Sequence, residues 1–172
     1  MPRKSHPFWR FSVRLYARSG VEAACLALQE AGADVNLLLF CCWQGSLGCR
    51  LGKPVLRQAI RSVAVWQRQV VQALRQARRS SKVSGIPVES GRALSKQVAK
   101  LELEAEYLEQ LMLAQHAVSE KQPAGASQAE QISAENLLRY LDLLGISATK
   151  PIKRQLQVLL AAATGDGPPP LQ

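Results

Sequence analysis

The chain has 172 residues, a length that fits one domain of ordinary size. Its hydrophobic content of 47% is enough for a packed core, which excludes a largely disordered chain. The net charge of +9 is unevenly distributed, because residues 1–87 contain 14 Lys or Arg against 3 Asp or Glu, whereas residues 88–145 contain 5 against 9. This asymmetry indicates either an acidic or polyanionic partner or neutralisation of charge between helices.

The amino-terminal third of the chain predicts three short helices. Leu, Ala and Gln are plentiful, and the β-branched clusters typical of strands are sparse, which favours an all-α fold. The apolar spacing predicts helices over residues 8–19, 21–31 and 35–43, with a break at Gly20 and with Asp34 as the N-cap of the third helix. The third helix is apolar on nearly every side, so we expect it to be the buried centre of the domain.

The middle of the chain predicts a long antiparallel helical hairpin. A helix is expected from residue 54 to about residue 81, and a second from residue 92 to about residue 119, joined by a short loop of Ser, Gly and Pro. Each helix contains apolar residues at alternating spacings of three and four, the pattern of a heptad seam. The first seam is Leu56, Ala59, Val63, Trp66, Val70, Ala73 and Ala77, and the second is Leu94, Val98, Leu101, Ala105, Leu108 and Met112.

The carboxyl-terminal third predicts a polar linker followed by two helices. The linker covers residues 120–131 and residues 164–172 are a flexible tail rich in Pro and Gly. The helices cover residues 133–145, with Ser133 as the expected N-cap, and residues 151–163. The expected fold class is therefore an all-α, single-domain helical bundle of six to seven helices, with the domain over residues 1–163.

The sequence predicts a cytoplasmic protein with no membrane span. Its basic amino terminus lacks the uninterrupted apolar region of a secretory signal. The strongest apolar run, at residues 35–43, is far shorter than the roughly 20 residues that cross a bilayer.

A row of basic residues on the first hairpin helix is the main candidate binding site. At about 100° per residue, these side chains fall within one arc of about a third of the helix circumference, opposite the predicted seam. We expect this face to point outward, towards an acidic protein surface or a phosphate backbone, although most such rows are only solvated surface. No aromatic residue accompanies the row for base stacking, because Trp66 lies in the seam. The candidate partner- or phosphate-binding residues are Arg57, Arg61, Arg68, Arg75, Arg78 and Arg79, flanked by Lys53 and Lys82.

Acidic residues on the second hairpin helix are expected to face a neighbouring helix. Glu102, Glu106 and Glu109 lie on one side of its predicted seam. We expect them to pair with arginines near the hairpin interface, and not to act as catalytic carboxylates, because no pocket signature accompanies them.

The sequence predicts no catalytic residue, no cofactor and no metal site. The four cysteines lack the paired spacing of zinc ligands, so we expect buried, reduced thiols. The two histidines have no orienting partner nearby in sequence, and no phosphate-binding loop or nucleophile motif is present. A small-molecule pocket, if the chain has one, is expected along residues 34–43. The cysteines are Cys25, Cys41, Cys42 and Cys49.

Residues 8–43 read FWRFSVRLYARSGVEAACLALQEAGADVNLLLFCCW. This segment resembles a bacterial family of small helical proteins labelled domain of unknown function 2390. The similarity continues through residues 65–79 and 101–110, and GADVNLLLF at residues 32–40 is its most specific part. The resemblance implies an all-α fold in a bacterial cytoplasm. It implies no activity and transfers no catalytic or binding residue.

The sequence leaves three functions open. The first is a non-enzymatic interaction module, an adaptor or regulator that presents the basic face to an acidic partner. The second is an RNA- or ribosome-associated protein that binds phosphate backbone through the same arginines. The third is an enzyme with a buried all-α small-molecule pocket. A homodimer formed through exposed edges of the seams is also left open.

Overall fold

The computed structural model describes residues 5–81, 87–118 and 125–165, and all of their regular structure is helical. A π turn, η1 (Gln67–Val71), joins α4 and α5 into one continuous helix, so the described residues contain seven helical rods. This confirms the all-α bundle of six to seven helices. Within these ranges, no helix has both the length and the apolar content to cross a bilayer. The helices are α1 (Pro7–Tyr16), α2 (Val21–Glu30), α3 (Val35–Ser46), α4 (Lys53–Trp66), α5 (Gln72–Ser80), α6 (Val88–Ala114), α7 (Ala126–Leu143) and α8 (Lys150–Thr164).

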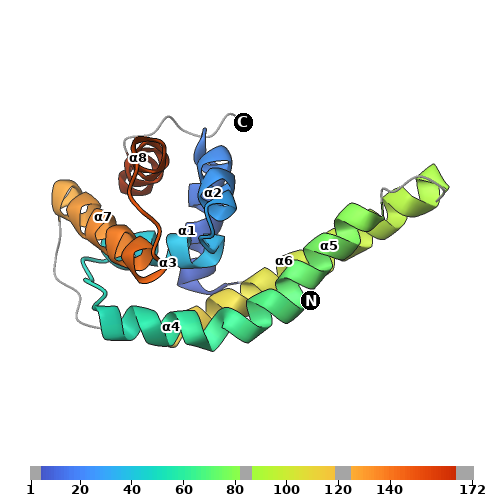
Figure 1. The fold of residues 1–172 in the computed structure, drawn as a ribbon, viewed down its shortest axis with the longest axis horizontal. Coiled ribbons are helices and arrows are strands. Elements are labelled where there is room, and N and C mark those ends of the chain that lie inside the picture. Colours follow the sequence, from blue (N-terminus) through green and yellow to red (C-terminus); the bar gives the residue numbers. More distant parts are fainter. Residues whose placement is uncertain (1–4, 82–86, 119–124, 166–172) are drawn as a thin grey trace.

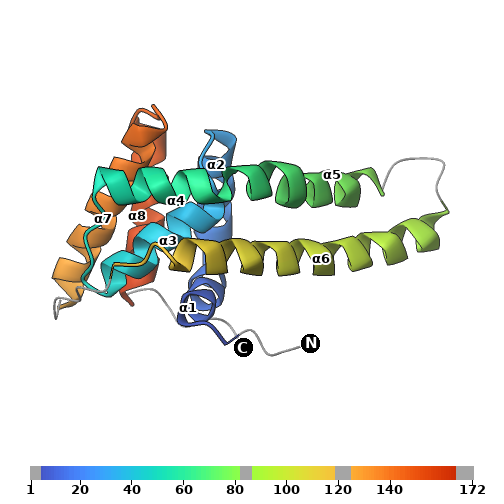
Figure 2. The ribbon, with the colours of Figure 1, turned by 90° about the horizontal axis from the view of Figure 1, so that it is seen from below.

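A helical hairpin projects from one side of the bundle (Figure 1). Helices α1, α2, α7 and α8 lie around α3. The α4–α5 helix and α6 run side by side and extend beyond the other helices in both views (Figures 1 and 2). The predicted hairpin is therefore confirmed, and residues 82–86, between its two helices in the sequence, lie outside the described ranges.

Helix α3 is the buried centre of the bundle, as the sequence predicts. Ten of its twelve residues are buried, and the helix continues three residues beyond its predicted end. Asp34 caps it as expected, because its Oδ1 accepts a hydrogen bond from the Leu37 N–H at 3.1 Å. Phe8 of α1 stacks on Trp43 with ring centroids 4.9 Å apart, and this contact fixes α1 against α3.

Helix α7 makes the largest contact with α3 and also fixes the chain that leaves α3. The buried Asn136 side chain donates to the carbonyl oxygens of Cys41 and Cys49, at 3.3 and 3.0 Å. It also accepts a hydrogen bond from the Leu51 N–H at 2.8 Å. One amide group thus ties α7 to the end of α3 and to the backbone that follows it.

The predicted linker at residues 120–131 is too long. Helix α7 already begins at Ala126, so the expectation of a helix starting at residue 133 is wrong. Ser133 does not cap the helix. It lies about two turns inside α7 and donates to the Cys42 carbonyl at 3.4 Å. Burial of Ile132 against the bundle supports the additional turns, and residues 119–124 lie outside the described ranges.

The close approach of α3 and α7 predicts that Gly45→Ala destabilises the fold. A Cβ atom at residue 45 would lie 2.5 Å from the Cα of Ser133 and 2.6 Å from its backbone nitrogen, so one helix must move. We expect the free energy of unfolding in urea to fall by about 2–3 kcal/mol.

Gly125→Ala is the matched control for this substitution. It lies at the start of α7 with nothing within 4 Å of its new Cβ atom, and should cost about 1 kcal/mol or less. Equal losses in the two variants would show that the α3–α7 contact is looser than described.

Candidate functional site

The π turn changes which residues of the first hairpin helix face α6. Before the turn, the predicted seam residues Leu56, Ala59 and Val63 are buried. After it, Val71 is buried in place of the half-buried Val70, and the two later alanines of the seam are exposed. A π turn holds one more residue than an α turn, so every later position is shifted by one along the seam. The seam residues that this shift exposes are Ala73 and Ala77.

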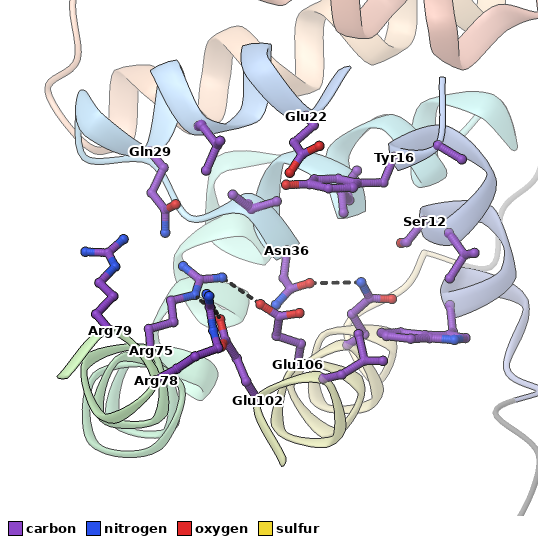
Figure 3. Close-up of a pocket in the computed structure, with 18 residues that line it drawn as sticks. Ser12, Tyr16, Glu22, Gln29, Asn36, Arg75, Arg78, Arg79, Glu102 and Glu106 are labelled. Carbon is purple, nitrogen blue, oxygen red and sulfur yellow. Dashed lines mark hydrogen bonds and ion pairs between the residues drawn. The ribbon is translucent and has the colours of Figure 1, made fainter. Parts of the chain in front are cut away.

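This shift turns two of the six candidate arginines towards α6. Arg75 Nε donates to Glu102 Oε1 at 3.1 Å, and Arg75 Nη2 donates to Glu106 Oε1 at 2.6 Å. Arg78 donates to both carboxylate oxygens of Glu102. Figure 3 shows these side chains converging between the two helices. The expectation that all six arginines face outward is therefore wrong for Arg75 and Arg78, and the pairing expected for Glu102 and Glu106 is confirmed.

The other four candidate arginines, Arg57, Arg61, Arg68 and Arg79, are exposed. Within the described ranges, Arg61, Arg68 and Arg79 form no ion pair. Lys53 donates to Asp142 of α7 at 2.7 Å, and this bond, together with the smaller influence of Arg57, lowers the pKa of the Asp142 carboxyl. Lys82 lies outside the described residues.

Helix α6 turns its acidic side inward and part of its predicted seam outward. Leu94, Leu101 and Leu108 are 44–53% exposed, so the expectation that they form a buried seam is wrong. Glu102 and Glu109 are buried instead, at 8% and 0% exposed. The reason is that this side of α6 packs against both α5 and α3. Helix α5 presents Arg75 and Arg78 to it, and α3 presents the polar side chain of Asn36. Of the predicted seam, Ala105 is buried.

A buried polar group connects α6 to the start of α3. The Asn36 side chain donates to Glu109 Oε2 at 3.0 Å and accepts from the Gln110 side chain at 2.9 Å. All three side chains are buried. Glu109 also contacts Asp34 through its side chain, and the Asp34 N–H donates to the Tyr140 hydroxyl of α7 at 2.8 Å. Three helices therefore meet at this polar group.

The surroundings of Glu109 favour its protonated form. Burial, and then the negative charge of Asp34, raise the pKa of the Glu109 carboxyl to about 9. A protonated Glu109 can donate a hydrogen bond to Asp34, whereas an ionised Glu109 has no proton to donate. The arrangement is a carboxyl–carboxylate pair that shares one proton.

A cleft of about 480 Å³ lies between α1, α2 and α3 on one side and the hairpin on the other. Figure 3 shows Ser12, Tyr16, Asn36 and Arg75 around it. Burial, followed by nearby Cys25 and acidic side chains, raises the pKa of Tyr16 to about 12, so its hydroxyl stays protonated. The segment expected to line a pocket, residues 34–43, contributes Val35, Asn36 and Leu39, but no pattern in the sequence indicates that α1, α2 and the hairpin form the other walls.

The cysteines are core residues, as predicted. All four are buried, and burial raises the pKa of Cys25 to about 12, which keeps that thiol protonated. Throughout the part of the chain that the structure describes, no three His, Cys, Asp or Glu side chains are grouped so that they could hold a metal ion.

Residues 7–113 match the model of a family described as protein of unknown function, DUF2390. The chain belongs to this family. The matched segment of this DUF2390 protein includes α1 to α6, so it contains the hairpin and every residue that lines the cleft. Helices α7 and α8 lie beyond it. Neither the curated proteins nor the solved structures contain a match to the chain.

The raised pKa of Glu109 predicts that Glu109→Gln changes how stability depends on pH. The unfolded Glu109 titrates near pH 4.5 and the folded one near pH 9, so between these values folding takes up a proton and wild-type stability falls as pH rises, by at most about 1.4 kcal/mol per pH unit. The glutamine side chain of the variant keeps a hydrogen-bond donor and does not titrate. Relative to wild type, we expect the variant to gain at least about 1 kcal/mol in free energy of unfolding between pH 5 and pH 8.

The matched control is Glu130→Gln, which neutralises an exposed carboxylate on α7. The difference in free energy of unfolding between this variant and wild type should stay constant from pH 5 to pH 8. A constant offset for Glu109→Gln as well would contradict the shared proton.

Proposed function

We propose that this DUF2390 protein is a non-enzymatic binding module of the cytoplasm, which presents the exposed arginines of its hairpin to an acidic protein surface. The supporting observation is that Arg61 and Arg68 are exposed on the α4–η1–α5 helix and form no ion pair with any described residue. They are seven residues apart, or about 10 Å along the helix axis.

The charge of this helix favours an acidic partner. Residues 53–80 contain seven Lys or Arg and no Asp or Glu. Two of these cations, Arg75 and Arg78, are neutralised by α6, and Lys53 pairs with α7. The remaining cations have no acidic residue on their own helix to neutralise them. An acidic surface on a partner protein would therefore raise the rate at which the two proteins associate and would fix their relative orientation.

Phosphate backbone is the alternative ligand for the same arginines, and one observation disfavours it. The Trp66 indole N–H donates to the Ala105 carbonyl at 3.0 Å, inside the hairpin. Its ring is therefore engaged between the two helices and is not presented beside the arginines as a stacking platform. A homodimer stays a prediction, for which the exposed Leu94, Leu101 and Leu108 row would supply the apolar contact.

The proposal predicts that Arg61→Glu combined with Arg68→Glu removes a specific protein partner. In an affinity pull-down from the native cytoplasm, analysed by quantitative mass spectrometry, we expect recovery of that partner to fall at least tenfold. The partner should remain bound after nuclease treatment and should be released by salt, because the contacts are charged and exposed.

Lys153→Glu combined with Arg154→Glu is the matched control. It makes the same change in net charge at two exposed positions on α8 and should leave recovery unchanged. Loss of all specific partners after nuclease would favour nucleic acid instead. Equal recovery with both double variants would contradict the role of the hairpin arginines.

A further inference from the structure

The cleft between α1–α2–α3 and the hairpin contains two buried polar atoms that have no hydrogen-bond partner among the described residues. They are Ser12 Oγ and Gln110 Oε1, and both side chains line the cleft. Each residue is only 3% exposed. A buried polar atom without a partner costs about as much as a lost hydrogen bond, so its retention beside a cavity points to a partner from outside the chain.

The outer part of the cleft is apolar and uncovered. Val13, Leu26 and Leu103 line it and are each 46–50% exposed, although they are among the larger hydrophobic side chains of the protein. Trp9 of α1 forms part of the same wall. Apolar walls around a few convergent polar groups are typical of small-molecule sites, and a volume of about 480 Å³ lies within their usual range.

The charges around the cleft favour a neutral ligand. Arg75 and Arg78 are already paired with Glu102 and Glu106. The remaining charged side chains, Arg79 and Glu22, are of opposite sign and are both exposed (Figure 3). The cleft therefore offers neither a surplus of positive charge to an anion nor a surplus of negative charge to a cation.

We propose that this cleft binds a small, neutral, amphipathic molecule whose hydroxyl or amide groups hydrogen-bond Ser12 and Gln110. Gln110 is fixed by its donation to Asn36, so its Oε1 can only accept and requires a donor on the ligand. Ser12 Oγ can donate or accept. The apolar body of the ligand lies against Trp9, Leu26 and Leu103. Arg61 and Arg68, which carry the proposed function, do not line this site, so it would serve a ligand other than the acidic partner.

The test is an NMR titration of the ¹⁵N-labelled full chain with 1-octanol, followed at the Trp9 indole and Gln110 side-chain amide resonances. We expect saturable shifts at both groups. Octanoate, which has the same chain length and a negative charge, should bind more weakly. No saturable shift with 1-octanol, or tighter binding of octanoate, would overturn the proposal.

Three variants separate binding in the cleft from adsorption elsewhere. Ser12→Ala removes a hydroxyl that makes no bond within the described chain, so it should weaken 1-octanol about three- to tenfold without lowering the melting temperature. Val13→Trp should fill the cleft and abolish binding, whereas Val65→Trp, at an exposed valine of α4, should bind as wild type does. Wild-type affinity in Ser12→Ala or Val13→Trp, or equal loss in Val65→Trp, would overturn the proposal.

Discussion

The buried carboxylate of Glu102 constrains the register of the hairpin. It is 8% exposed and accepts hydrogen bonds from Arg75 and Arg78, which are three residues apart on α5. A buried carboxylate costs several kcal/mol unless cations and hydrogen bonds compensate it. Helix α5 must therefore present these two arginines to α6, and a regular helix that continued the seam of α4 would present Ala73 and Ala77 instead. The π turn at η1 supplies a one-residue shift, which allows α4 to bury its apolar seam while α5 directs Arg75 and Arg78 to Glu102.

The shift also separates the arginines that follow the π turn from those before or within it. Arg75 and Arg78 become part of the fold, where they neutralise the acidic side of α6 and line one end of the cleft. Arg61 and Arg68 remain on the surface. The burial of Glu102 and Glu109 in turn places Leu94, Leu101 and Leu108 on the outside of α6. Buried ion pairs contribute little net stability, so their effect here is on geometry: they decide which side chains are available to partners.

The sequence predicted the parts of the fold that depend on local pattern. Helix α3 was expected to be central because it lacks a polar side, and the hairpin was expected because two long apolar repeats flank a short turn. The π turn could not be predicted, since QRQVV has nothing that distinguishes it from an ordinary α-helical segment. The start of α7 was misplaced because Ser133 resembles a cap, and only its contact with α3 shows that it is buried.

The candidate site was only partly predictable for a related reason. The pairing of acidic residues of α6 with arginines followed from charge alone, but which arginines pair depends on the register after residue 67. Glu109 was expected to pair with an arginine, which is wrong, because the side chain that donates to it is Asn36, 73 residues away in the sequence. The cleft likewise depends on Ser12 and Gln110, which are 98 positions apart and have no common motif.

The most direct test of this account is a double-mutant cycle on Arg75 and Glu102, with Arg75→Met, Glu102→Gln and the double variant measured by urea unfolding. The side chains are 16% and 10% exposed, so we expect a coupling free energy of at least about 1 kcal/mol. The exposed Glu89–Arg92 pair, at 84% and 60%, provides the reference cycle and should give under about 0.5 kcal/mol. A coupling for Arg75 and Glu102 as small as this reference would contradict the claim that the pair sets the register of the hairpin.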